Sequence, residues 1–101
     1  RNSKVADLIK ELKTWGVQVV AIDPWASADE VQHEYGFSLG EITPSAPVDS
    51  LVVAVGHNEF RTLSAQTLRS YVRTERPVIA DVKSLYKREE LAAQGFTVFR
   101  L

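Results

Sequence analysis

Two apolar segments in the second half of the chain are followed by side chains that could do chemistry. His57 comes shortly after residues 51–55, and Asp81 and Ser84 come at or just after the end of residues 77–82. A serine, a histidine and an aspartate are the residue types of a nucleophile, a general base and an orienting acid. No nucleophile-elbow pattern surrounds Ser84, however, and a helix cap explains this serine better.

Lys83 lies just past the second of these segments, at the expected start of a helix. There a basic side chain and the free N–H groups of the helix could bind a phosphate together. The alternatives are that Lys83 is a solvated loop residue, or that it pairs with the carboxylate of Asp81. Residue chemistry alone does not separate these interpretations.

His57 could act as a general base or as a metal ligand, because it follows a strand directly. No second histidine or acid lies near it at metal-ligand spacing, so we expect no metal site and a partly exposed histidine. The five glycines are isolated, and none belongs to a Gly-rich strand-to-helix turn. A self-contained dinucleotide site is therefore not expected.

Helices and strands alternate in the predicted order, which decides where these residues lie. Residues 51–55 are apolar at every position, which is typical of a strand in the middle of a parallel sheet. Arg100 indicates that the last strand is at an edge. The pattern predicts an α/β fold: a three-layer, Rossmann-like domain with a doubly wound, mostly parallel sheet of about four strands. Helices are expected over residues 3–15, 28–35, 65–72 and 83–93, strands over 17–22, 51–55, 77–82 and 96–101, and a loop over 37–50.

A sheet of this kind normally begins with a strand, whereas this chain begins with the helix that should follow it. We therefore expect residues 1–101 to be a single domain, the C-terminal part of a longer protein, which lacks its first strand. A gap is then expected beside residues 51–55, either closed by residues 17–22 or filled by another chain.

Composition limits the possible partners. The chain has 101 residues, a length typical of one domain. Its net charge of −1, with scattered basic residues, indicates no nucleic-acid or membrane-surface partner. The absence of cysteine excludes disulfides and a cysteine nucleophile in these residues. Because no signal-peptide pattern and no apolar run of membrane-spanning length is present, we expect a cytoplasmic protein.

Five short motifs follow one another along the chain: Arg1-Asn2-Ser3 before a helix, Asp23-Pro24 after a strand, His57 and Phe60 after the next strand, Asp81-Val82-Lys83, and Gly95-Phe96. In this order they resemble the C-terminal, UDP-binding domain of the UDP-glucose/GDP-mannose dehydrogenase family, over nearly the whole chain. The first resembles the end of that family's D-x-R-x-S segment. Val-Gly-His and Asp-Val-Lys are more similar to the branch that acts on UDP-N-acetylhexosamines.

The resemblance implies roles for several residues. Lys83 takes the position of a basic residue that contacts the UDP-sugar, and Arg1 that of an arginine that contacts NAD. His57, Asp81 and Ser84 are candidates for the edge of the site. The UDP-glucose branch has Asp-Gly-Arg at the third strand end, and a lysine there cannot form the forked contact of an arginine.

The resemblance also implies the reaction, which is the NAD-dependent oxidation of the C6 alcohol of a UDP-sugar to a uronic acid for bacterial surface polysaccharide synthesis. The expected ligand is a UDP-N-acetylhexosamine. The family's catalytic cysteine and Gly-rich NAD site lie outside this domain. We therefore expect NAD to be bound mainly by absent domains, this fragment to be inactive alone, and the parent protein to be a homodimer or larger.

Two other functions stay open at this point. One is a free-standing, flavodoxin-like binding or signalling module without catalysis, whose strand-end loops form a docking surface. The other is a small hydrolase that uses His57 and Ser84.

Overall fold

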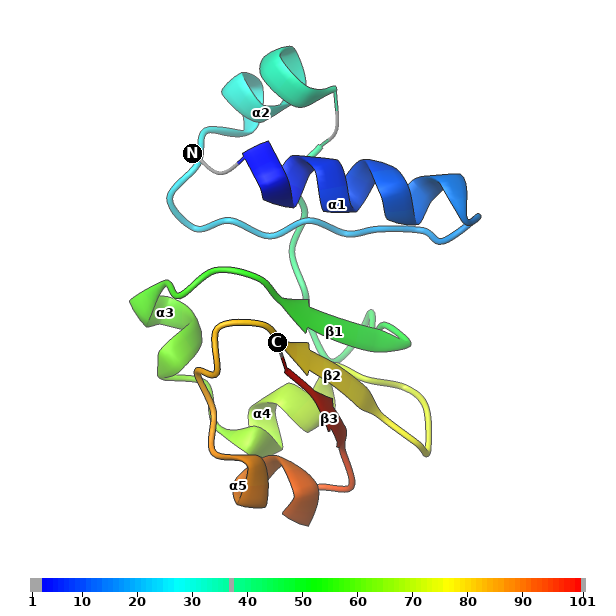
Figure 1. Cartoon of the computed structure of the whole chain (residues 1–101), viewed down its shortest axis with the longest axis vertical. Coiled ribbons are helices and arrows are strands. Elements are labelled where there is room, and N and C mark those ends of the chain that lie inside the picture. Colours follow the sequence, from blue (N-terminus) through cyan, green and yellow to red (C-terminus); the bar gives the residue numbers. More distant parts are fainter. Residues whose placement is uncertain (1–2, 37, 101) are drawn as a thin grey trace. The chain divides into compact units, whose positions relative to one another are not determined.

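The computed structural model describes residues 3–36 and 38–100 of the chain (Figure 1). It divides into two compact units, Arg1–Ile42 and Thr43–Leu101, and each is described by itself. The expectation that residues 1–101 are a single domain stays a prediction.

The first unit contains two helices, α1 (Ser3–Thr14) and α2 (Ala28–Tyr35). Both were expected from the sequence. Ala6 and Ile9 of α1 are buried, and their three-residue spacing places them on one helical face. The side chain of Ser27 caps α2 by accepting a hydrogen bond from the backbone N–H of Glu30. A buried face in α1 and a serine cap in α2 are therefore local features that stabilise these helices.

Residues 17–22 do not form the expected strand. Within the described residues they make one isolated parallel bridge, Ala21 with Leu39, supported by a 2.8 Å hydrogen bond from the Gly40 N–H to the Ala21 carbonyl. Val17 and Val20 are 49% and 50% exposed. The prediction was wrong because β-branched residues favour a strand only where a neighbouring strand pairs with their backbone.

The second unit is built on a parallel sheet of three strands in the order β1-β2-β3, whose arrows point the same way in Figure 1. This confirms the α/β class with a parallel sheet, although three strands are seen where about four were expected. It also confirms the edge position of the last strand. The strands are β1 (Ser50–Val53), β2 (Val78–Asp81) and β3 (Thr97–Phe99).

The position of β1 differs from the expectation. In the described part of the chain β1 pairs only with β2, so it lies at an edge of the sheet rather than in the middle. Its Val52 side chain is 49% exposed. An unpaired edge on this strand agrees with the gap that was expected beside residues 51–55.

Helices α3 (Asn58–Arg61) and α4 (Ala65–Ser70) connect β1 to β2, and α5 (Arg88–Ala93) connects β2 to β3. The helical side of the sheet carries Leu51, Ile79 and Val98, which are aligned by the strand register. The opposite face carries Val52 and Phe99, which are 49% and 58% exposed. The core of this unit therefore lies between the sheet and its helices, and consists of Leu68, Val72, Ile79, Leu91 and Phe96.

Residues 38–49 contain only isolated bridges, as expected for a loop, and Ser50, which was expected to belong to the loop, already begins β1. None of the described helices is long and apolar enough to cross a membrane.

Candidate functional site

The carboxyl ends of β1 and β2 lie side by side, because Val53 and Asp81 are paired in the register of the parallel sheet. Ligands of open α/β sheets bind outside this edge. The segment with His57 and the segment with Lys83 both leave the sheet here. The structure therefore brings the two strand-end motifs to one edge.

Asp81 is the last residue of β2 and is 0% exposed. Its Oδ1 accepts a 2.9 Å hydrogen bond from the Leu85 N–H, and its Oδ2 accepts a 3.0 Å hydrogen bond from the Tyr86 N–H. The Arg100 guanidinium, which follows β3, lies 3.7 Å from Oδ2. The carboxylate therefore points into its own loop, and it is not a surface group available to a ligand.

Asp81 holds the loop of residues 82–86 with both its backbone carbonyl and its side-chain carboxylate. The Ser84 N–H donates to the Asp81 carbonyl over 3.2 Å, and Ser84 adopts a positive φ of 53°. Helix α5 begins only at Arg88, with Lys87 at its N-cap. The expected helix start at residue 83 and the expected Ser84 cap were therefore wrong, because the Asp81 side chain takes the N–H groups that a helix start would leave free.

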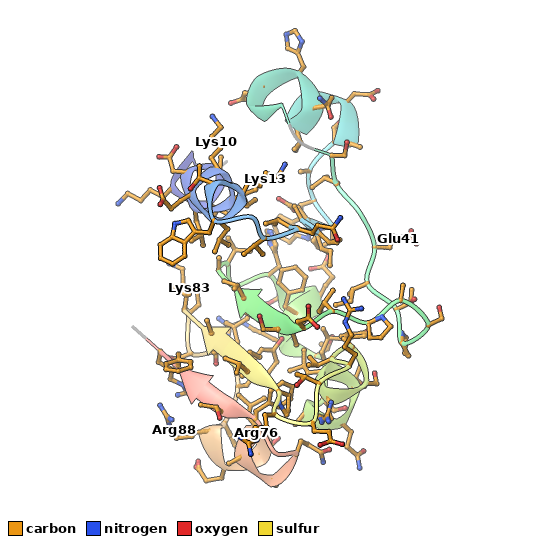
Figure 2. All side chains as sticks on the ribbon, turned by 90° about the vertical axis from the view of Figure 1, so that its right-hand side faces the viewer. Lys10, Lys13, Glu41, Arg76, Lys83 and Arg88 are labelled. Atoms are coloured by element: carbon orange, nitrogen blue, oxygen red, sulfur yellow. The ribbon has the colours of Figure 1, made fainter. Side chains whose placement is uncertain are left out.

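Lys83 lies at the tip of this loop and is exposed. Figure 2 shows its side chain beyond the arrowhead of β2, at the opposite end of that strand from Arg76. Its ammonium has no ion pair with any residue that the structure describes, and Asp81 is paired with Arg100 instead. The sequence left open an ion pair between Lys83 and Asp81, and the structure contradicts that interpretation.

His57 is half-buried and occupies the N-cap of α3 without a capping hydrogen bond from its side chain. Its ring packs against Phe60 at a centroid distance of 5.5 Å and a tilt of 59°. The sequence did not predict α3, because four residues are too few for a periodic pattern. A hydrolytic triad is disfavoured because the carboxylate of Asp81 serves its own loop rather than orienting a histidine.

Tyr86 and Arg100 are site-supporting residues that sequence reasoning missed. The Tyr86 hydroxyl donates a 2.5 Å hydrogen bond to the Phe60 carbonyl in α3, and the Arg100 guanidinium donates to the Tyr86 carbonyl. Burial raises the pKa of Tyr86 to about 12, with smaller contributions from Asp81 and Tyr71. Tyr86 therefore stays a neutral hydrogen-bond donor, which ties the 82–86 loop to α3.

This pKa gives a testable expectation for alkaline titration. The difference in tyrosinate absorbance between the wild-type chain and Tyr86→Phe should show a phenol that ionises near pH 12 rather than 10. Because the unfolded chain ionises first, the contribution of Tyr86 to stability should be constant below pH 10 and fall as the pH rises from 10 to 12. A difference curve centred at pH 10 would contradict the buried, hydrogen-bonded phenol.

Two further expectations concern cofactors and metals. Arg1, the candidate NAD contact, lies outside the described residues. The residues that are described do not fit a complete NAD site, because Gly56, the glycine after β1, stands alone and α3 has four residues. Among the positions that the structure covers, no group of three His, Cys, Asp or Glu residues could hold a metal ion.

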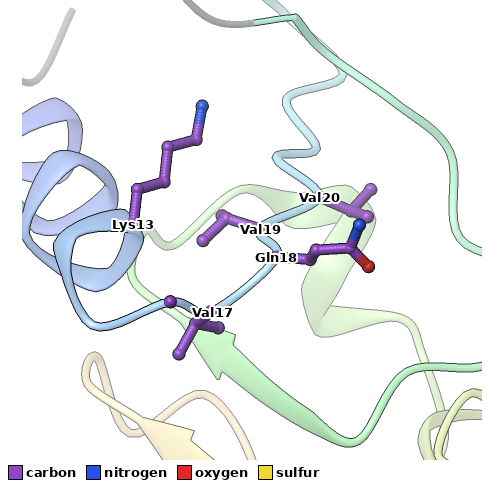
Figure 3. Close-up of a pocket in the computed structure, with 6 residues that line it drawn as sticks. Lys13, Val17, Gln18, Val19 and Val20 are labelled. Carbon is purple, nitrogen blue, oxygen red and sulfur yellow. The ribbon is translucent and has the colours of Figure 1, made fainter.

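The first unit carries an open pocket of about 590 Å³, shown in Figure 3. Among the described residues that line it, Lys13 is the only charged one, and most of the others present aliphatic or backbone atoms. Such a surface offers few convergent polar groups, so we place the candidate site at the carboxyl edge of the sheet. The pocket is lined by Lys13, Gly16, Val17, Gln18, Val19 and Val20.

Comparison with known proteins identifies a family to which the chain is similar. The UDP binding domain of the UDP-glucose/GDP-mannose dehydrogenase family matches residues 1–88. The chain is 34% identical over 90 residues to a UDP-N-acetyl-D-glucosamine 6-dehydrogenase of Pseudomonas aeruginosa, which covers 89% of this chain and 21% of that protein. It is 32% identical over 90 residues to the enzyme of that name from Salmonella typhi, with the same coverage of 89% and 21%.

A further relative is a UDP-glucose 6-dehydrogenase of Rhizobium meliloti (strain 1021), which is 28% identical over 98 residues, or 95% of this chain and 22% of that protein. The chain thus spans about a fifth of the length of the curated relatives it matches.

Proposed function

Because the chain belongs to the UDP-glucose/GDP-mannose dehydrogenase family, as its UDP binding domain, we propose that it is the nucleotide-sugar-binding domain of an NAD-dependent UDP-sugar 6-dehydrogenase. The family match over residues 1–88 confirms the resemblance and covers the first four of the five sequence motifs. The chain corresponds to about a fifth of its relatives, so the reaction of the whole protein is part of the proposal.

The observation that carries the proposal is the placement of Lys83. Its exposed ammonium stands at the carboxyl edge of the sheet, on a loop with a fixed backbone, and without an ion pair in the described residues. A cation in this position can contact an anionic or carbonyl oxygen of a UDP-sugar. Because a lysine ammonium is a point charge, the contact is to one oxygen at a time.

The proposed sugar is an N-acetylhexosamine. The two UDP-N-acetyl-D-glucosamine 6-dehydrogenases are 34% and 32% identical to the chain, against 28% for the UDP-glucose 6-dehydrogenase. This order supports the branch that the Val-Gly-His and Asp-Val-Lys motifs indicated. The proposed product is the corresponding uronic acid, made for surface polysaccharide synthesis.

The reactive centre is proposed to lie elsewhere in the protein. The chain has no cysteine for a covalent intermediate and no Gly-rich turn for NAD. We extend the proposal to Arg1 as a contact to NAD, with most of the cofactor held outside this chain, and to a cytoplasmic homodimer or larger assembly. What these residues contribute is one wall of the site, which binds and orients the substrate.

The test is a titration of the isotope-labelled 101-residue chain with UDP, followed by amide chemical shifts. Shifts are expected to concentrate in residues 82–86 and 54–58. Lys83→Ala should weaken binding about tenfold, since it removes a hydrogen bond between two charged groups. Arg76→Ala is the matched control, because it removes an exposed cation at the other end of β2.

The control variant should bind UDP as the wild type does. Equal weakening by Arg76→Ala and Lys83→Ala would mean that UDP responds only to the overall charge. Shifts spread over the chain without saturation would contradict a UDP site at this edge.

A further inference from the structure

The starting observation is that Asp81 is a fully buried carboxylate beside an exposed lysine. Burying a charge is costly unless it is hydrogen-bonded and paired. Asp81 is 0% exposed and meets this requirement with the N–H groups of Leu85 and Tyr86 and with the Arg100 guanidinium. The groups that stabilise it all belong to the carboxyl edge of the sheet.

These contacts determine where the backbone of Lys83 lies. On one side of Lys83, the Val53 carbonyl accepts from the Val82 N–H, and the Asp81 carbonyl accepts from the Ser84 N–H across Lys83. On the other side, the Asp81 carboxylate holds Leu85 and Tyr86. Lys83 is therefore enclosed in a turn that closes on Asp81, and its side chain is the part left in solvent.

Tyr86 and Arg100 connect this turn to the neighbouring elements. The Tyr86 hydroxyl holds the Phe60 carbonyl of α3, and the guanidinium of Arg100 holds the Tyr86 carbonyl from the end of β3. The loop is thus tied to segments that leave all three strands.

We propose that Asp81 is a positioning residue for Lys83, and that the ligand it serves is the diphosphate of a nucleotide sugar. The inference rests on the proposed function for the contact made by Lys83. Asp81 does not touch the ligand, because its oxygens are buried in the turn. Its effect is that the backbone of Lys83 is already ordered before the ligand binds. The free energy of binding is therefore not reduced by the entropic cost of ordering this loop.

The experiment is a double-mutant cycle of Asp81→Asn and Lys83→Ala in the 101-residue chain, with UDP as the ligand. The asparagine has one oxygen acceptor and one NH₂ group, so one of the two N–H contacts of the turn is lost. Asp81→Asn should weaken UDP binding about tenfold in the wild-type background and by less than about twofold in the Lys83→Ala background, because the two residues act as one unit.

Asp49→Asn is the matched control. Its carboxylate is also paired with an arginine, Arg73, at 2.9 Å, but its side chain is 79% exposed and the pair lies away from the turn. UDP binding should stay within about twofold of the wild type, as expected for an independent surface site.

A readout independent of UDP separates this inference from the proposed function. Asp81→Asn should increase the fast backbone motion of residues 82–86, measured by amide heteronuclear relaxation. In the Asp49→Asn variant, the same residues 82–86 should stay as ordered as in the wild type. If Asp81→Asn does not fold, Tyr86→Phe removes only the tie to Phe60 and should weaken UDP binding about threefold to fivefold.

The outcomes divide as follows. Loss of UDP binding by Asp81→Asn to the same extent in both backgrounds, or an unchanged loop, overturns the positioning role. A wild-type chain that does not bind UDP, combined with a loosened loop in Asp81→Asn, overturns the proposed function and supports the placement of Lys83 by Asp81.

Discussion

Replacing Ile79 with alanine is expected to lower the free energy of unfolding by about 2–5 kcal/mol. Ile79 is 0% exposed and lies in the middle strand, paired with Leu51 on one side and Val98 on the other. Its side chain belongs to the core cluster that includes Leu68 of α4 and Leu91 of α5. The substitution removes three carbon atoms that both the strands and the helices contact, and it leaves a cavity that a small core cannot close completely.

The effect is large compared with the total stability of a domain, which is usually about 5–15 kcal/mol. Urea unfolding followed by circular dichroism measures it directly, with Val52→Ala as the matched control. Val52 lies on the opposite face of the sheet and is 49% exposed, so its loss should be about 1 kcal/mol or less. If both variants lost the same stability, the packing of the helices on one face of the sheet would be contradicted.

The parts of the fold that could be predicted from the sequence are those with local causes. The run of apolar residues at 51–55 predicted β1, and helical spacing of apolar residues predicted α1 and α4. Ser27 and Ser64 are the N-caps of α2 and α4, and both accept a hydrogen bond from the N–H three residues later. In each case the residues that decide the structure are neighbours along the chain.

The structure of residues 17–22 is not decided by their local sequence. Their pattern is as β-branched as that of residues 51–55, yet in the described residues only one bridge forms there. A strand gains its stability from the backbone hydrogen bonds of its neighbour. Because the neighbour lies elsewhere in the sequence, the pattern of a segment cannot indicate whether pairing occurs.

The candidate site could likewise be predicted from the sequence only in part. Lys83 could be placed at a strand end from the sequence alone, since it follows an apolar run directly. The role of Asp81 could not, because a carboxylate at this position is equally suited to a ligand contact or to a loop anchor. Its partner Arg100 is separated from it by a whole crossover with α5, and the link from Tyr86 to Phe60 joins residues 26 positions apart. Such contacts appear only when the chain is folded.

Asp81→Ala is expected to lower the free energy of unfolding by about 3 kcal/mol, a second large effect with a different cause. The variant leaves the N–H groups of Leu85 and Tyr86 without their acceptor. It also leaves the Arg100 guanidinium, whose side chain is only 25% exposed, without its counter-charge. Urea unfolding at neutral pH measures the loss.

Asp49→Ala is the informative comparison. If the distance within each ion pair decided its contribution to stability, Asp49 would contribute more than Asp81. The pair of Asp49 with Arg73 is short, at 2.9 Å, but the side chains are 79% and 59% exposed. An exposed pair gains little over its hydration, so we expect a loss of about 0.5 kcal/mol or less. The pair of Asp81 with Arg100 is longer, at 3.7 Å, and is expected to contribute more because water cannot replace the missing partner.

The cause of the Asp81 effect can be separated with Arg100→Met. In the Asp81→Ala background this substitution removes a buried charge that has lost its partner, so it should restore about 1 kcal/mol. The Arg100 Nε is already buried without a hydrogen-bond partner among the described residues, which increases the gain from removing it. A further loss of stability on adding Arg100→Met to Asp81→Ala would contradict this. The guanidinium would then stabilise this edge mainly through its hydrogen bond to the Tyr86 carbonyl. The loss in Asp81→Ala would come from the unpaired N–H groups of the turn.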